Sequence, residues 1–65
     1  MKHEFLRGFL QSQIDTVRER MRKNKDLMLS PEVSLGSKKI LEQENDDWNR
    51  MLTKLKIELK RLGDE

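Results

Sequence analysis

The sequence predicts an all-α fold, an antiparallel two-helix hairpin that forms a single domain over residues 1–65. Three observations carry this prediction. Apolar residues recur at steps of three and four in two long stretches, which is the spacing of one face of a helix. The break between these stretches contains Pro31 and Gly36, and a short break makes neighbouring helices antiparallel. Charged residues make up 40% of the chain and Cys is absent, which suits an exposed helical rod without disulfides.

The first helix is expected over residues 2–28. Its apolar seam follows three-, four- and seven-residue spacings through Leu6, Leu10, Ile14, Val17, Met21 and Met28. Phe5 and Phe9 widen the apolar face near the start of this helix. Gly8 lies in the helix interior, where glycine costs about 1 kcal/mol relative to alanine. The first turns are therefore expected to be the weakest part of the helix.

The second helix is expected over residues 31–62. The tripeptide Ser-Pro-Glu at 30–32 is a helix-start signal, because Ser caps a helix, Pro suits its first position and an acid favours the positive end of its dipole. A start at Ser37, after Gly36, is the alternative. Gly63 is a natural residue to follow the last turn.

The seam of the second helix is the most regular feature of the chain. It alternates steps of four and three, with one position skipped, through Leu41, Trp48, Leu52, Leu55, Leu59 and Leu62. The skipped position is polar, Asn45. A buried Asn on a helix seam sets register or oligomeric state at a cost in stability, and this interpretation is favoured over a polar binding site. Trp48 is interpreted first as a core residue and second as an anchor for a partner.

Folding the chain at the break predicts which residues face each other. With the turn at 29–31, residues lie opposite when their numbers add to about 62, which places Met21 near Leu41 and Ile14 near Trp48. The same register sets three arginines level with three acids, Arg18, Arg20 and Arg22 with Glu42, Glu44 and Asp46. Apolar and charged patterns thus agree on one antiparallel hairpin.

Two helices cannot cover all of the apolar surface. Phe5, Phe9, Met51 and Ile57 fall beside or outside the main seam. A two-helix layer leaves an open face, which either a second copy covers by forming a four-helix bundle or another protein covers. The sequence therefore predicts a homodimer or a protein partner, with these four residues and Trp48 as candidate partner-binding residues.

Residues that could support catalysis or hold a cofactor are sparse. The three glycines are scattered, so no phosphate-binding loop is expected. His3 is the only His, and no Cys nucleophile exists. Glu42 and Asp46 share a helix face but lack the Glu-x-x-His motif of carboxylate-bridged metal bundles, so they are interpreted as a solvated face. The sequence predicts no catalytic residue, no metal and no cofactor.

The net charge of +2, from 14 basic and 12 acidic side chains, describes a mixed surface. This balance argues against nucleic acid as the main partner, although a basic run over 18–25, interrupted by Glu19, could meet phosphates. No stretch approaches the ~20 apolar residues of a membrane span, and residues 1–10 lack the continuous apolar core of a signal peptide. No membrane association and a cytoplasmic location are therefore expected.

Residues 30–45 resemble part of a known family of similar length. A Ser-Pro-Glu-Val start at 30–33 is followed by Ser37, then by Ile40, and later by Asn45. This pattern resembles the small sporulation-regulatory aspartyl-phosphate phosphatases of spore-forming bacteria (the stage-zero, E-type family). Members are antiparallel helical hairpins whose second helix often opens with a Ser/Asp-Pro-Glu-Val-like start, followed by a Ser-Gln-Glu-Leu-Asp motif and later an Asn.

The resemblance implies a response regulator as the partner. Ser37 and Asn45 match the family pattern, whereas Lys38, Lys39 and Leu41 depart from it. In the family, the carboxylates of the motif act on a phosphorylated Asp of a response regulator. Leu41 stands in place of the Asp and Lys39 in place of the Glu, so the resemblance implies binding without dephosphorylation. Of the family's functional residues, the resemblance implies only Ser37 and Asn45 in this chain, as contact residues.

The sequence thus favours a small non-enzymatic regulatory protein that acts by helix-mediated protein–protein binding, with a response regulator as the candidate partner. Two alternatives stay open. One is a divergent phosphatase of response-regulator aspartyl phosphate that controls sporulation. The other is a nucleic-acid-binding helical hairpin, which would show steep salt dependence.

Overall fold

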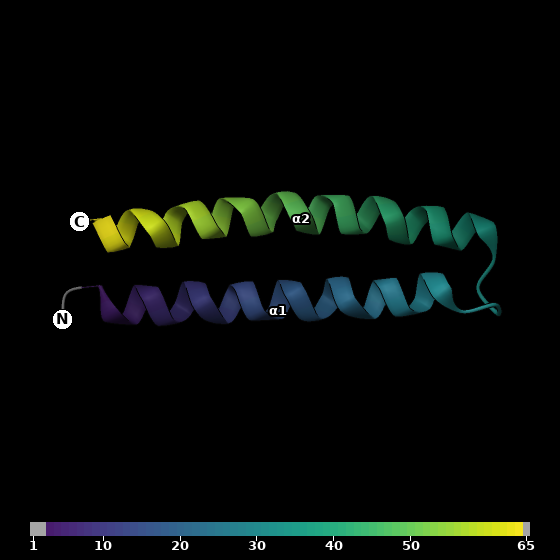
Figure 1. The fold of residues 1–65 in the computed structure, drawn as a ribbon, viewed down its shortest axis with the longest axis horizontal. Helices are drawn as coiled ribbons and strands as arrows, with labels where there is room; N and C mark the ends of the chain where they lie inside the picture. Colours follow the sequence, from purple (N-terminus) through teal and green to yellow (C-terminus); the bar gives the residue numbers. More distant parts are fainter. Residues whose placement is uncertain (1–2, 65) are drawn as a thin grey trace.

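The protein is a hairpin of two long antiparallel helices. The computed structural model describes residues 3–64 and contains α1 (Glu4–Leu29) and α2 (Leu35–Asp64). Figure 1 shows the two helices side by side along their lengths, in a rod of 49 × 14 × 10 Å. Residues 3–64 contain no β-strand. The predicted all-α antiparallel hairpin is confirmed, whereas its pairing into a four-helix bundle stays a prediction.

The two apolar seams form the contact between the helices. Ile14 and Val17 of α1 and Leu52 of α2 are buried together as the core cluster. Half-buried apolar side chains pack against this cluster, namely Met21, Trp48, Leu55 and Leu59. Each fully buried aliphatic side chain contributes about 1.5–3 kcal/mol. The stability of the hairpin therefore depends on a small number of side chains.

The second helix begins at Leu35, later than the predicted start at Pro31. Ser34 provides the cap. Its Oγ accepts the backbone N–H of Ser37 at 3.2 Å, and its carbonyl accepts the N–H of Lys38 at 2.9 Å. These bonds satisfy backbone donors that the first turn of a helix leaves unpaired.

The Ser-Pro-Glu tripeptide makes a turn instead of a helix start. The N–H of Val33 donates to the carbonyl of Ser30 at 3.3 Å, and the N–H of Glu32 donates to the Ser30 Oγ at 3.4 Å. The observed start thus differs both from the predicted start at Pro31 and from the alternative at Ser37, because the hydroxyl of Ser34, which lies between them, caps the helix. At its other end α2 continues through Gly63 to Asp64 with no positive φ at the glycine.

The register of the hairpin differs from the predicted one by one heptad. Asn24 Nδ2 donates to Asn45 Oδ1 at 3.0 Å across the helices, so residues face each other when their numbers add to about 69. The observed pairing is thus displaced by seven residues from the predicted one. A shift of seven returns apolar positions to apolar positions. The seam was predicted correctly, but the pairings of Met21 with Leu41 and of Ile14 with Trp48 were wrong.

The predicted alignment of three arginines with three acids changes with the register. Arg22 pairs within α1, with Glu19 at 2.6 Å and with Asp26 at 3.9 Å. Arg20 does reach across, because its guanidinium carbon lies 5.5 Å from the centroid of the Trp48 ring. The predicted row of ion pairs between the helices is therefore replaced by one cation–π contact, between Arg20 and Trp48.

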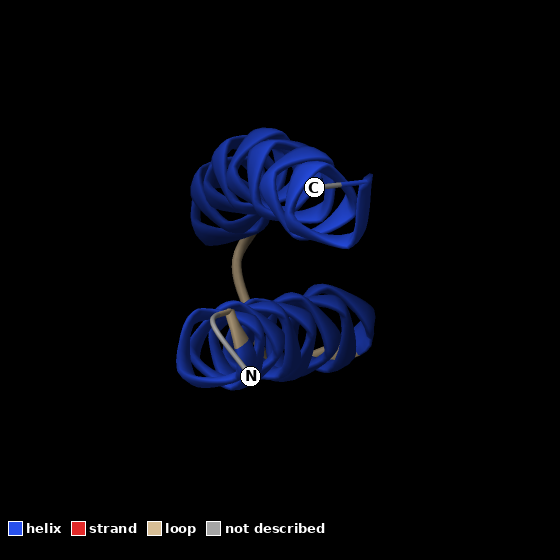
Figure 2. Ribbon diagram, turned by 90° about the vertical axis from the view of Figure 1, so that its left-hand side faces the viewer, coloured by secondary structure: helices blue, strands red, loops and turns tan. Residues whose placement is uncertain are grey.

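Both broad sides of the helix pair are open. Figure 2 shows the hairpin end-on, with two helices in a single layer. Large apolar side chains are exposed along this layer: Phe5, Leu6, Phe9, Leu27, Leu29, Leu35, Ile40, Met51 and Ile57. A helix pair of this kind keeps apolar surface that a partner can bury.

Candidate functional site

An apolar groove runs between the helices at the open end of the hairpin, away from the connecting turn. Its volume is about 420 Å³, and it is lined by Leu6, Phe9, Leu10, Glu58, Arg61 and Leu62. We call it the apolar groove. Leu10 is buried at its base, whereas Leu6 and Phe9 are about half exposed. Spacings of three and four residues place the lining side chains of each helix on one side of that helix.

Charged side chains form part of the rim of this groove. Glu58 and Arg61 stand three residues apart on α2, beside the apolar lining. An apolar centre with a polar rim is the usual anatomy of a protein–protein interface. The groove therefore has the chemistry to receive an apolar side chain from a partner and to hydrogen-bond around it.

The structure does not bring the predicted partner-binding residues to one surface. Phe9 lines the apolar groove, and Phe5 precedes it by one turn with 85% of its surface exposed. Met51 and Ile57 are exposed but do not line the groove. Ser37 lies in the first turn of α2, at the opposite end of the hairpin.

Asn45 is buried on the seam, as predicted, and its amide is used within the hairpin. Its Oδ1 accepts from Asn24 Nδ2 at 3.0 Å, and its Nδ2 donates to the backbone carbonyl of Met21 at 3.2 Å. Asn24 is equally buried. Together they form a polar layer that joins α1 to α2 in one register.

Sequence reasoning missed Asn24, although a signal for it was present. The seam of α1 steps by three and four through Val17 and Met21, and its next positions are Asn24 and Met28. The seam predicted from the sequence included Met21 and Met28 but left out Asn24, the polar residue between them. Two polar positions, one on each helix, define a register that apolar positions alone leave open.

Trp48 is anchored beside this polar layer. It packs against the core cluster, as its core interpretation predicted, and its Nε1 donates to Glu44 Oε1 at 3.1 Å. Asn24 Nδ2 donates to the same oxygen at 3.0 Å. These two hydrogen bonds, from Asn24 and then Trp48, hold the pKa of Glu44 below its usual value, and the nearby positive charge of Arg20 lowers the pKa further.

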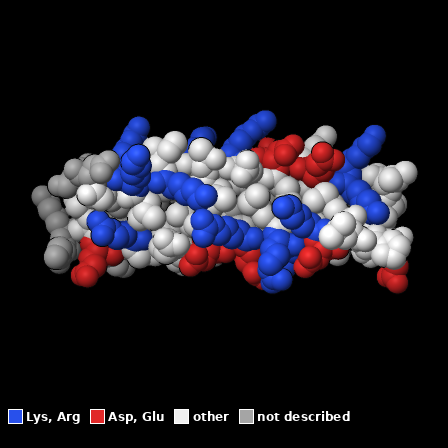
Figure 3. All heavy atoms as spheres, viewed as in Figure 1, with Lys and Arg blue, Asp and Glu red and all other residues white. Residues whose placement is uncertain are grey.

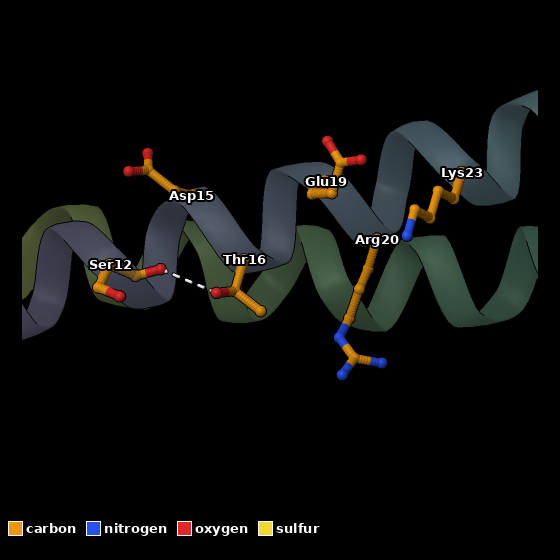
Figure 4. A pocket seen from close by; sticks show the side chains of 6 residues that line it. All are labelled: Ser12, Asp15, Thr16, Glu19, Arg20 and Lys23. Carbon is orange, nitrogen blue, oxygen red and sulfur yellow. Dashed lines mark hydrogen bonds between the residues drawn. The ribbon is translucent and has the colours of Figure 1, made fainter.

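A shallow hollow on the outer side of α1 has no convergent chemistry. It is lined by Ser12, Asp15, Thr16, Glu19, Arg20 and Lys23, all from one helix. Figure 4 shows these side chains pointing apart, with Asp15 and Glu19 on one side and Arg20 on the other. Thr16 Oγ1 donates to the backbone carbonyl of Ser12 at 3.0 Å, a bond within the helix. The hollow offers no set of groups aimed at a common point.

Groups that would hold a metal do not gather in the described part of the chain. Residues 3–64 contain no cluster of three or more His, Cys, Asp or Glu side chains suited to a metal ion. Over the same residues, neither helix is long and apolar enough to cross a membrane. The described surface thus presents mainly apolar and charged side chains.

Comparisons with protein-family models, with curated proteins and with solved structures found no match for this chain. The class that the structure defines is an antiparallel two-helix hairpin with an apolar groove at its open end.

Proposed function

We propose that this chain is a small non-enzymatic regulatory protein that acts by binding another protein through the apolar groove. The observation that carries the proposal is the groove itself. Phe9 and Leu6 leave about half of their surfaces in water beside a buried Leu10. Aromatic side chains at such positions are the usual anchors of protein–protein interfaces.

The size and rim of the groove support a protein as the occupant. A volume of about 420 Å³ admits one or two large side chains from a partner helix. Glu58 and Arg61 offer one acceptor and one donor group beside the apolar lining, which favours a partner with mixed charge around an apolar anchor. Burying the exposed halves of Leu6 and Phe9 would gain about 1.5–3 kcal/mol in total before the cost of association.

The resemblance of residues 30–45 to the sporulation phosphatase family suggests the class of partner. We extend the proposal to a response regulator bound without dephosphorylation, because Leu41 occupies the place of the family's Asp. The alternative is a divergent phosphatase acting on the regulator's aspartyl phosphate. The two differ in one measurable property, the loss of phosphate from the regulator.

The test is direct binding of purified receiver domains of the source organism's response regulators, each in phosphorylated and unphosphorylated form. The full chain is titrated into each domain by calorimetry, and release of inorganic phosphate is followed in parallel. The proposal expects saturable binding to a receiver domain without faster phosphate release. Accelerated release would favour the phosphatase, and failure of every receiver domain to bind would refute the response-regulator partner.

Two variants locate the binding surface. Phe9→Glu places a charge in the apolar groove, whereas Leu27→Glu introduces the same charge at a half-exposed position outside it. Phe9→Glu should weaken binding at least about tenfold, with Leu27→Glu near the parent. Equal effects of both variants would contradict the groove as the site.

Self-association is measured on the same proteins, because a second copy is the competing occupant of the groove. Sedimentation at tens of micromolar distinguishes a monomer from the predicted homodimer. A dimer that Phe9→Glu dissociates and Leu27→Glu leaves intact would assign the groove to a four-helix bundle. A monomer that binds a receiver domain would assign it to the partner.

A further inference from the structure

A second groove lies between the helices, and its walls are basic. It is lined by Arg18, Met21, Arg22 and Lys25 from α1 and by Leu52 from α2, with a volume of about 280 Å³. We call it the basic groove. Figure 3 shows one face of the hairpin on which Lys and Arg side chains gather along the middle, over both helices. Since the net charge of the chain is only +2, such a concentration of positive charge is local.

The basic groove and the apolar groove open on different sides of the hairpin. No residue lines both. Phe9 and Arg18 stand nine residues apart, and nine steps of about 100° turn a helix by two and a half revolutions. They therefore project from opposite sides of α1, and a ligand of one groove leaves the other accessible.

Two of the three cations in the basic groove keep their charge available for a partner. Arg22 is held by carboxylates of its own helix, Glu19 and Asp26. Arg18 and Lys25 make no ion pair or hydrogen bond through their side chains within residues 3–64. They stand seven residues apart, about 10 Å along the helix. That spacing matches two carboxylates seven residues apart on a second helix.

The floor of the basic groove is apolar. Leu52 is buried and Met21 is half-buried, and a methionine adapts its shape to the side chain placed on it. No aromatic side chain lines the groove, so it lacks the stacking platform by which proteins hold unpaired bases. Cations beside an apolar floor fit an amphipathic acidic helix better than a nucleic acid.

We propose that the basic groove binds an acidic amphipathic helix of a partner protein. An apolar residue of that helix lies against Met21 and Leu52, and carboxylates about one heptad apart face Arg18 and Lys25. This surface goes beyond the proposed function, because it uses none of the residues of the apolar groove. It gives the hairpin a second, charge-selective contact on its other side.

The test uses a designed probe and the full chain. The probe is a fluorescent 21-residue amphipathic helix with Leu on its apolar stripe and Glu on both flanks. Its companions are the same peptide with Lys in place of Glu, a scrambled acidic peptide and a labelled 20-base-pair DNA duplex. Anisotropy titrations at low and physiological salt should show that the acidic helix binds at least about tenfold more tightly than the scrambled or basic peptide.

Charge reversal identifies the surface. The double variant Arg18→Glu, Lys25→Glu should bind the acidic peptide at least about tenfold more weakly than the parent does. The same variant should gain binding of the basic peptide. The control pair Lys39→Glu with Lys54→Glu changes the net charge equally at exposed positions outside the groove and should stay near the parent. Circular dichroism verifies that each variant is folded, and the corresponding alanine pair replaces any that is not.

Several results would overturn the proposal. Equal binding of the acidic and scrambled peptides would reduce it to non-specific charge attraction. If the control pair weakened binding of the acidic peptide equally, the basic groove would not be the binding site. Tighter binding of the DNA duplex than of the acidic helix, lost on reversal of Arg18 and Lys25, would assign the groove to nucleic acid.

Discussion

The polar layer of Asn24 and Asn45 predicts a loss of stability when one partner is removed. Asn45→Ala deletes two cross-helix hydrogen bonds, to Asn24 at 3.0 Å and to the carbonyl of Met21 at 3.2 Å. Each buried bond contributes about 0.5–1.5 kcal/mol, so the variant should lose about 1–3 kcal/mol. A chain of this length has a total stability of about 3–10 kcal/mol, so the loss is a large fraction of it.

Thermal unfolding followed by circular dichroism at fixed protein concentration measures this loss. For a domain of this size, 1 kcal/mol lowers the Tm by about 4–8 °C, so Asn45→Ala should melt about 4–24 °C below the parent. Asn24→Leu with Asn45→Leu should melt at or above the parent, because both polar groups are replaced by apolar ones. An unchanged Tm in Asn45→Ala would refute the energetic role of the layer.

The double leucine variant also tests whether the layer fixes register. Leu41→Cys combined with Met28→Cys reports the observed register, in which residue numbers add to about 69. Leu41→Cys combined with Met21→Cys reports the register shifted by one heptad. The chain has no other Cys. The parent should cross-link through position 28 alone, and the leucine variant through both. Cross-linking of the leucine variant through position 28 alone would show that the connection sets the register without the Asn pair.

Three further outcomes follow from other features. Glu44→Gln should flatten the fall of Tm as the pH drops below about 5, because a carboxylate with a lowered folded pKa stabilises above its unfolded pKa and loses that contribution as pH falls through the folded value. Ser34→Ala should lower the free energy of unfolding by about 1 kcal/mol in denaturant titrations, more than Ser30→Ala. Gly8→Ala should raise it by about 0.5–1 kcal/mol, since an added Cβ meets nothing within 4 Å in the helix.

Each of these outcomes has a control that removes a simpler explanation. Glu42→Gln removes one negative charge from an exposed position of the same helix, so it controls for the change in net charge. Ser34→Asp should retain the helix cap and hence most of the stability. Gly8→Pro should destabilise by about 3 kcal/mol if the first turns of α1 are helical in solution. A pH profile shared by Glu44→Gln and the parent would contradict the shifted pKa.

The heptad spacing predicted which side chains form the seam between the helices. It did not predict the register, that is, which residue of α1 faces which residue of α2. Ile14, Val17 and Leu52 were all assigned to the seam from spacing alone, and they form the core. A slide of seven residues leaves that assignment intact, so apolar periodicity cannot distinguish the two registers. The choice needs a feature without a seven-residue repeat. Asn24 with Asn45 is one, and the capping hydroxyl of Ser34 is another.

The candidate site was only partly visible in the sequence. Phe9 was identified because it lies beside the seam. Leu6 and Leu62 were assigned to the seam, yet they line the apolar groove. Whether a seam residue is covered at the end of a hairpin depends on the register and on where each helix ends. Nothing in the sequence singles out the rim residues Glu58 and Arg61, because their position beside the groove also depends on the register and on the helix ends.

The ends of both helices lie together, and the apolar groove lies between them. Figure 1 shows the start of α1 and the end of α2 at the same end of the rod, with the turn at the far end. A fluorophore, tag or fused domain joined to the start of α1 or to the end of α2 would thus be attached beside the groove. The connection at 30–34 is separated from it by most of the 49 Å length. Probes of binding are therefore best attached at that connection. A ligand fused to the start of α1 or to the end of α2 would occupy the groove at high effective concentration.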